Sequence, residues 1–250
     1  HEDCAHVLRK SWSAMVGQSE QEAASALLDD HDKLAIFDMA RAGDASFQAC
    51  EAQLDGGMPV DTQADNGESM LMAAAEGGAV RLIELCLRKG ANVMLADKEG
   101  RTALHYAGAF PVAGEALIKG NGDIFAKDRR GRTPLHEACR YGHCYPARLK
   151  GAFSDATSGV NSASIMGITP LHCATRGVKQ PKERWDGPGG LDGHPNCVEL
   201  LIQNGAETSP VDNDGNTPAH FAALQTSQNG YKCVPNCHSY LGTVGHPTEA

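Results

Sequence analysis

The stretch Gly131–His143, GRTPLHEACRYGH, decides how the rest of the sequence is interpreted. Its two histidines lie close to arginines and a cysteine, a set of side chains that could form a catalytic cluster. The same short motif recurs, however, as RTALH at Arg101–His105, ITPLH at Ile168–His172 and NTPAH at Asn216–His220. Self-similarity at a regular interval is typical of repeat architectures. A histidine used four times in one local setting therefore indicates a structural role.

The repeat has landmarks that keep their register along the chain. The apolar residues of the TPLH-like turns are Ile36, Leu71, Leu104, Leu135, Leu171 and Ala219, with successive spacings of 35, 33, 31, 36 and 48. A D-x-x-G loop precedes three of these turns, as DKEG, DRRG and DNDG. The largest departure is an insertion of 15 residues at 178–192, which falls at a turn. Insertions at turns rather than within helices predict a stacked architecture.

Each repeat is predicted to contain two short helices. In the fourth repeat Thr133 can supply an N-cap oxygen and the following proline suits the first helical turn, so we expect a helix over Pro134–Tyr141. A second helix is predicted at Val80–Gly90, VRLIELCLRKG, with an apolar face and a final glycine as its C-cap. Such a helix pair cannot bury its apolar face alone. The sequence therefore predicts an all-α chain of stacked units.

These motifs resemble the ankyrin-repeat family. TPLHEACRYGH and TPLHCATRG match the first helix of an ankyrin repeat, and VRLIELCLRKGANVMLADKEGRTALHYA matches a whole repeat boundary. The resemblance covers about five repeats and a partial sixth, over residues 34–242. It implies an all-α solenoid of helix-turn-helix units with protruding hairpin loops and a concave face that binds partners.

The resemblance also assigns a role to the recurring histidine. In this family the histidine of the turn links the loop of one repeat to the next by hydrogen bonds. That role carries over to His105, His136, His172 and His220. The first two repeats lack this histidine and have Asp38 and Met72 instead, which predicts looser or terminal packing there.

Residues outside the repeats divide the remainder of the chain. We expect residues 1–33 to form a helical extension that caps the first repeat; the alternative is an extension that contacts a partner. The repeat domain extends over residues 34–242, interrupted by the insertion at 178–192. Residues 243–250 form a C-terminal tail.

Composition limits the function classes. A hydrophobic content of 41% and a charged content of 21% are ordinary for a folded domain, and no apolar run is long enough to span a bilayer. The net charge of −9 argues against a partner made of nucleic acid or anionic lipid. Nine cysteines without framework spacing indicate free thiols in a reducing compartment. The sequence begins at His1, and we expect a processed product of the cytoplasm, or of a plastid or mitochondrion.

The sequence carries little that indicates an enzyme. It has no P-loop and no G-x-S-x-G motif, and we expect no cofactor. One metal-like cluster is present: Cys233, Cys237 and His238 could supply three zinc ligands. Because no second ligand pair has suitable spacing, a metal- or redox-responsive module is the alternative function rather than the leading one.

The leading function is a non-catalytic scaffold that binds proteins, either an adaptor or an accessory subunit of a larger assembly. Loop tips and helix ends are the variable positions of ankyrin repeats. There the sequence places Arg101, Phe110, Arg129, Arg130, Arg132, Arg140, Tyr141 and Arg176. Arginine and aromatic residues are enriched at interfaces, so this strip predicts an acidic or phosphorylated protein segment as the ligand. The alternative is a solvated face whose arginines are offset by Asp97 and Asp128.

The insertion adds one more candidate contact residue. Trp185 lies in a long loop rich in proline and glycine, where it has little core to enter, so we expect it to contact a partner. The alternative is that its ring folds back over the neighbouring helix turn.

Overall fold

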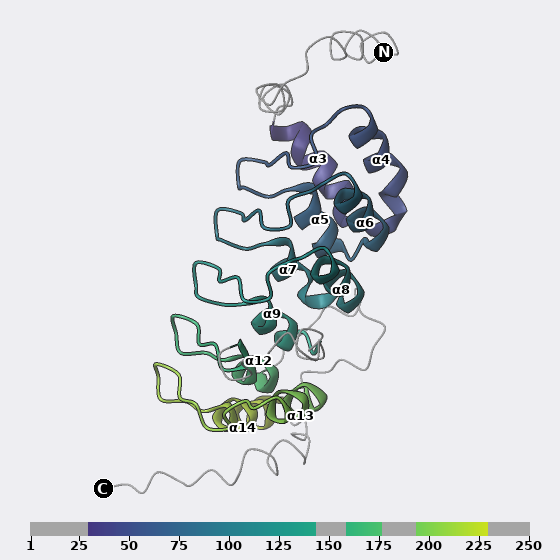
Figure 1. Cartoon of the computed structure of the whole chain (residues 1–250). Helices are drawn as coiled ribbons and strands as arrows, with labels where there is room; N and C mark the ends of the chain where they lie inside the picture. Colours follow the sequence, from purple (N-terminus) through teal and green to yellow (C-terminus); the bar gives the residue numbers. More distant parts are fainter. Residues whose placement is uncertain (1–29, 144–158, 177–193, 230–250) are drawn as a thin grey trace, which may run out of the picture. The chain divides into compact units, whose positions relative to one another are not determined.

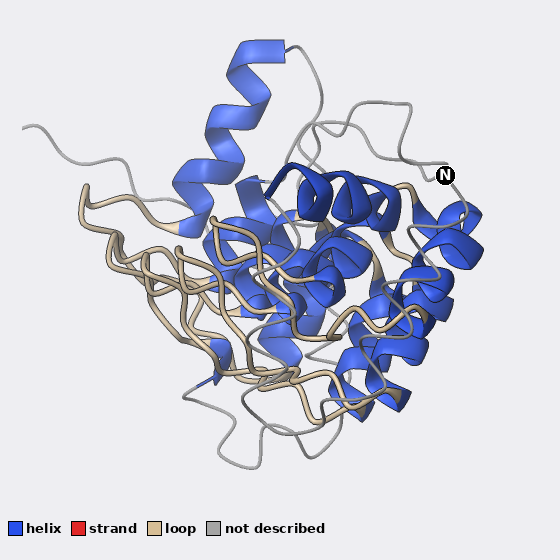
Figure 2. Ribbon diagram, turned by 90° about the horizontal axis from the view of Figure 1, so that it is seen from above, coloured by secondary structure: helices blue, strands red, loops and turns tan. Residues whose placement is uncertain are grey.

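The computed structural model describes residues 30–143, 159–176 and 194–229 (Figure 1). These residues form helices joined by turns and loops, and none of them lies in a strand (Figure 2). The prediction of an all-α repeat fold is therefore confirmed. The chain divides into two compact units, His1–Gly122 and Asp123–Ala250. Residues 1–29, the insertion at 178–192 and the tail at 243–250 lie outside the described part of the chain.

The first unit is a stack of helix pairs. Its helices are α3 (Asp30–Arg41), α4 (Phe47–Asp55), α5 (Met70–Gly77), α6 (Val80–Arg88), α7 (Ala103–Tyr106) and α8 (Pro111–Lys119), with short 3₁₀ turns η1 (Gly43–Ser46) and η2 (Ala107–Ala109). Helix α5 packs between α3 and α7, whereas α6 packs between α4 and α8 (Figure 1). The first helices of successive repeats thus form one layer of this unit, and the second helices form the other.

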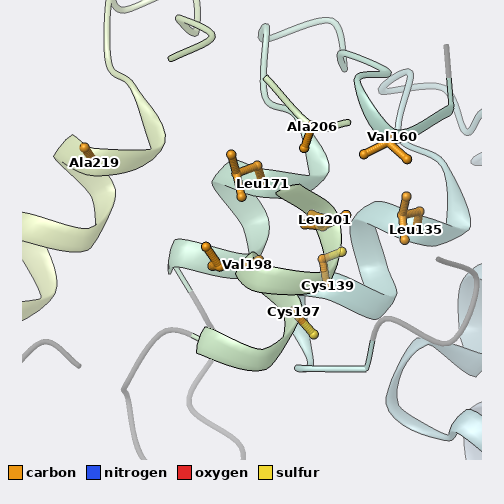
Figure 3. Packing of buried hydrophobic residues seen from close by; sticks show 10 residues of the cluster. Leu135, Cys139, Val160, Leu171, Cys197, Val198, Leu201, Ala206 and Ala219 are labelled. Atoms are coloured by element: carbon orange, nitrogen blue, oxygen red, sulfur yellow. The ribbon is translucent and has the colours of Figure 1, made fainter. Parts of the chain in front are cut away.

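The second unit repeats this arrangement around α12. Its helices are α9 (Pro134–Arg140), α12 (Pro170–Arg176), α13 (Pro195–Gln203) and α14 (Pro218–Asn229). Helix α12 contacts α9, α13 and α14. Figure 3 shows the core of this unit, in which Leu135, Leu171 and Leu201 are almost fully buried beside Val160 and Val198. Full burial of one such side chain contributes about 1.5–3 kcal/mol, so neighbouring repeats depend on each other for stability.

The repeated histidine is a structural residue, as the sequence predicts. At the start of α9, Nδ1 of His136 accepts a hydrogen bond from the backbone N–H of Thr133 at 3.0 Å. The ring proton is therefore on Nε2, which donates to the backbone carbonyl of Ile168 at 3.0 Å. His136 is 1% exposed, so it joins the N-cap of its own helix to the loop of the next repeat inside the core.

The same link is present one repeat later. Nδ1 of His172 accepts from the N–H of Thr169 at 3.2 Å, and Nε2 donates to the carbonyl of Asn216 at 3.1 Å. Burial lowers the pKa of His172, an effect that outweighs the hydrogen bond to Asn216. The predicted linking role is therefore confirmed for both histidines.

The second repeat, which lacks the histidine, is not loosely packed as the sequence suggested. Met72 is buried, and Oγ of the N-cap Ser69 accepts a hydrogen bond from the backbone N–H of Met72 at 3.4 Å. Arg41 at the end of α3 pairs with the buried carboxylate of Glu68, and its Nε lies 2.7 Å from Oε2 of Glu76. An ion-pair network therefore joins the first repeat to the second, whereas His136 and His172 make the corresponding links in the second unit.

Helix ends agree with the sequence to within two residues. Helix α6 ends at Arg88, and Gly90 follows in the left-handed conformation with φ of +84°. The N–H of Gly90 donates to the carbonyl of Leu87 at 3.0 Å, and that of Ala91 donates to Cys86 at 2.9 Å. This double hydrogen bond is the Schellman arrangement, which requires a residue that tolerates positive φ.

Candidate partner-binding surface

Three of the hairpin loops are each held in shape by a buried aspartate. In the loop before α9, Oδ1 of Asp128 accepts hydrogen bonds from the N–H groups of Arg130 at 2.9 Å and Arg132 at 2.8 Å. Gly131 completes the turn with φ of +72°. Asp97 and Asp212 form the same contacts in their own loops. The carboxylate therefore fixes the backbone and leaves the two central residues of the loop directed to solvent.

The three hairpin tips of the second unit are joined to one another through their backbones. The N–H of Ile165 donates to the carbonyl of Arg130 at 2.9 Å. In the next loop, the N–H of Asn213 donates to the carbonyl of Met166 at 3.0 Å, and its side-chain amide donates to Ile165 at 3.0 Å. Figure 1 shows these loops projecting side by side from the helices of this unit. The tips therefore form a single ordered surface.

Two of the predicted contact arginines are also part of the scaffold. Arg132 pairs with Oδ2 of Asp128 at 2.8 Å and with Glu137. Arg101 pairs with Oδ2 of Asp97 at 2.8 Å. For these two arginines the structure shows the alternative to a binding strip: an aspartate neutralises the charge of the side chain.

Arg129 and Arg130 differ from these two residues. Both are exposed, and they occupy the central positions of the hairpin tip. The carboxylate of Asp128 faces the backbone and Arg132, and it makes no ion pair with either side chain among the described residues. Their charges are therefore available to a partner.

The remaining candidates of the second unit lie at helix ends. Arg140 is 46% exposed and lies 3.8 Å from Oε2 of Glu137, a distance at which the pairing is weak. Tyr141 follows α9 as its C-cap and is half-buried. The guanidinium of Arg176 is exposed and lies 5.7 Å from the ring centroid of Phe221. These positions keep cationic groups at the ends of α9 and α12.

Arg101 and Phe110 belong to the first unit. Phe110 is half-buried, and a methyl group on Gly78 would come within 2.4 Å of its ring. The ring therefore packs tightly on the backbone of the preceding repeat and presents only part of its surface to solvent.

The sequence interpretation missed two exposed residues in the middle of this surface. Ile165 is 67% exposed and Met166 is 55% exposed. They occupy the tip of a hairpin that has Ser164 where three other loops have Asp97, Asp128 and Asp212, so the D-x-x-G pattern does not identify it. The signal that remains is Gly167, whose φ of +74° gives the same turn.

Two predicted features fall elsewhere. Trp185 and the metal-like cluster of Cys233, Cys237 and His238 lie outside the described residues. Within the described part of the chain, no three His, Cys, Asp or Glu side chains are grouped as metal ligands. None of the helices in that part is both long and apolar enough to cross a bilayer.

Comparison with known proteins identifies the repeat. Models of ankyrin repeats match residues 36–114, 130–149 and 191–234, on both sides of the insertion. The chain belongs to the ankyrin-repeat family. Ankyrin repeats are generally protein–protein interaction modules and are typically non-catalytic. The matched segments lie within the range of 34–242 predicted from the motifs.

The relatives of this ankyrin-repeat chain agree with that assignment. It is 24% identical over 168 residues to the transient receptor potential cation channel subfamily A member 1 of Drosophila melanogaster, covering 67% of this chain. The match spans 10% of the channel. A chain from the complex of the Bd0816 predatory endopeptidase with immunity protein Bd3460, from Bdellovibrio bacteriovorus, has a TM-score of 0.56 at 24% identity. That alignment covers 78% of this chain and 93% of the other, and it supports the fold.

Proposed function

We propose that this ankyrin-repeat chain is a non-catalytic scaffold, an adaptor or accessory subunit that binds an acidic or phosphorylated protein segment. The observation that carries the proposal is the exposed pair Arg129 and Arg130 on an ordered hairpin tip. In a chain of net charge −9, two adjacent guanidinium groups without ion partners among the described residues form a local cationic site. Such groups bind carboxylates and phosphates by directional hydrogen bonds.

Arg140 and Arg176 extend this cationic site toward the helix ends. A partner that lies along the tips and reaches the helices would contact all four arginines. Because long-range attraction between charges raises the association rate, binding should weaken as salt increases.

The experiment is a pulldown from the native source with the purified full chain as bait. Arg129→Glu with Arg130→Glu should lose a specific set of partners, while the far-ultraviolet circular dichroism stays unchanged. Arg132 is kept in this test, because removing it leaves the buried Asp128 without its cation, at a cost of about 1–3 kcal/mol. Loss of partners then reports on binding and not on unfolding.

A matched control separates a local site from overall charge. Lys98 occupies the position in the first unit's DKEG loop that Arg129 occupies in DRRG, and it is also exposed. Lys98→Glu therefore makes the same charge change as Arg129→Glu at an equivalent backbone position. The comparison is therefore between Arg129→Glu alone and Lys98→Glu. If these two single variants lose the same partners equally, the effect is one of net charge and the proposed site is wrong.

A further inference from the structure

The hairpin tips of the second unit differ in chemistry from one to the next. The tip of the first loop carries Arg129 and Arg130, the middle tip carries Ile165 and Met166, and the third carries Asn213 and Asp214. All six residues are exposed. The surface therefore changes from cationic through apolar to polar and acidic across three loops.

The apolar middle tip has no structural explanation within the unit. Ile165 and Met166 are 67% and 55% exposed, and the hydrogen bonds to the neighbouring loops are made by their backbones. The turn itself is stabilised by other groups, because Oγ of Ser164 accepts from the N–H of Ile168 at 3.1 Å. Two polar residues would serve the loop equally well. Holding two apolar side chains in water on an ordered backbone is a cost that binding would recover.

We infer that Ile165 and Met166 form an apolar contact site for a linear segment of a protein partner. That segment carries an apolar residue, which packs on Ile165 and Met166, and acidic residues on one side of it. The inference rests on the proposed function, which it deepens by naming a second contact and an orientation. Stable interfaces combine an apolar centre with a polar rim, and arginine and methionine are enriched in them. The three tips present that combination in a row.

Charge complementarity fixes the order of the groups in the partner. Acidic or phosphorylated residues of the segment face Arg129 and Arg130. The segment's aliphatic or aromatic residue lies over Ile165 and Met166. Beyond it, the side facing Asp214 carries no acidic residue, because like charges repel at close range.

The hydrogen bonds between the tips make this surface suited to a linear ligand. Ile165 and Asn213 connect each tip to the one before it at 2.9–3.0 Å, so the backbone is already ordered. A preorganised surface loses less conformational entropy on binding, which favours contacts with short segments.

The experiment begins with selection of a phage-displayed library of random twelve-residue peptides on the purified full chain. We expect the selected peptides to share an acidic run on one side of an apolar residue. One such peptide, made with a fluorescent label, then serves as the probe in anisotropy titrations. Failure to enrich any peptide, or enrichment without this pattern, would overturn the inference.

Variants separate the two contacts. The double substitution Ile165→Ser and Met166→Ser should raise the dissociation constant of the probe about tenfold or more, the size of effect expected for an interface hot spot. Val112→Ser is the matched control, because Val112 is 63% exposed on α8 and does not lie on a hairpin tip. The affinity of the Val112→Ser variant for the probe should equal that of the wild type. Circular dichroism and the urea midpoint verify that each variant is folded.

The outcomes distinguish this inference from the proposed function. If the arginine variants weaken binding and the Ile165 and Met166 variants do not, the proposed function stands and the apolar contact site is wrong. If neither pair matters, both are wrong. If light scattering shows that the wild type is a dimer and that the serine variants are monomers, the apolar tip contacts a second copy of this chain, and the inference is overturned.

Discussion

The substitution His136→Ala tests whether the repeated histidine stabilises the stack between repeats or only within one helix. In the native structure the ring accepts from the N–H of Thr133 at 3.0 Å and donates to the carbonyl of Ile168 at 3.0 Å. Alanine removes both contacts. It leaves Thr133, which is 1% exposed, with a buried N–H that water does not reach.

The expected cost follows from these two groups. A buried donor without a partner costs about 1–3 kcal/mol, and the half-buried carbonyl of Ile168 adds a smaller loss of about 1 kcal/mol. We therefore expect His136→Ala to lower the free energy of unfolding by about 2–4 kcal/mol. With a urea m-value of about 2 kcal/mol/M, the unfolding midpoint should fall by about 1–2 M.

The chain supplies its own control in the last repeat. Nδ1 of His220 accepts from the N–H of Thr217 at 3.1 Å, but Nε2 has no hydrogen-bond partner among the described residues. His220→Ala therefore removes an N-terminal cap contact alone, at about 1 kcal/mol. The difference between the two variants reports the link to the next repeat together with the deeper burial of Thr133, because Thr217 is only half-buried.

The assay is urea unfolding followed by circular dichroism at 222 nm, combined with hydrogen exchange of peptides that cover α9 and α14. Exchange is needed because a repeat array can unfold in stages from one end. Equal shifts for His136→Ala and His220→Ala, with equal loss of amide protection around each site, would show that the hydrogen bond to Ile168 adds no net stability. The histidine would then stabilise only its own helix and not the contact between repeats.

Three further predictions follow from the first and second units. Gly78→Ala should destabilise the protein more than Gly90→Ala, because both have positive φ but only the added methyl on Gly78 meets the ring of Phe110; urea midpoints compare them. Burial lowers the pKa of His172 in the folded state below its ordinary value of about 6.5. The neutral ring therefore contributes its full stability above pH 6.5. That contribution is lost as the pH falls from 6.5 through the lower folded-state pKa. His172→Gln should therefore reduce the difference in urea midpoint between pH 7.5 and pH 5. Burial raises the pKa of Cys86 to about 12, so iodoacetamide at pH 8 should label this thiol only after unfolding, as judged by peptide mass mapping.

Much of the fold could be predicted from the sequence because the determinants are local and repeated. A threonine N-cap, a proline in the first turn and a glycine after the second helix act within a few residues, and each has the same physical effect in every copy that carries it. The link at Arg41 could not be predicted in this way. It depends on Glu68 and Glu76, which come from another repeat and follow no motif.

The binding surface was harder to predict, because a count of arginines does not show which of them are already paired. The hairpin geometry supplies the missing rule. In the loop D-x-x-G-R, the arginine lies four residues after the aspartate and pairs with it, as Arg132 does with Asp128, whereas the two residues between aspartate and glycine face solvent. Applied to the loop Ser164–Gly167, which has no aspartate, the same positions identify Ile165 and Met166 as exposed. We therefore propose that a partner contacts the second and third residues of each hairpin tip, whereas the fifth, as in Arg101 and Arg132, pairs with the aspartate of the scaffold.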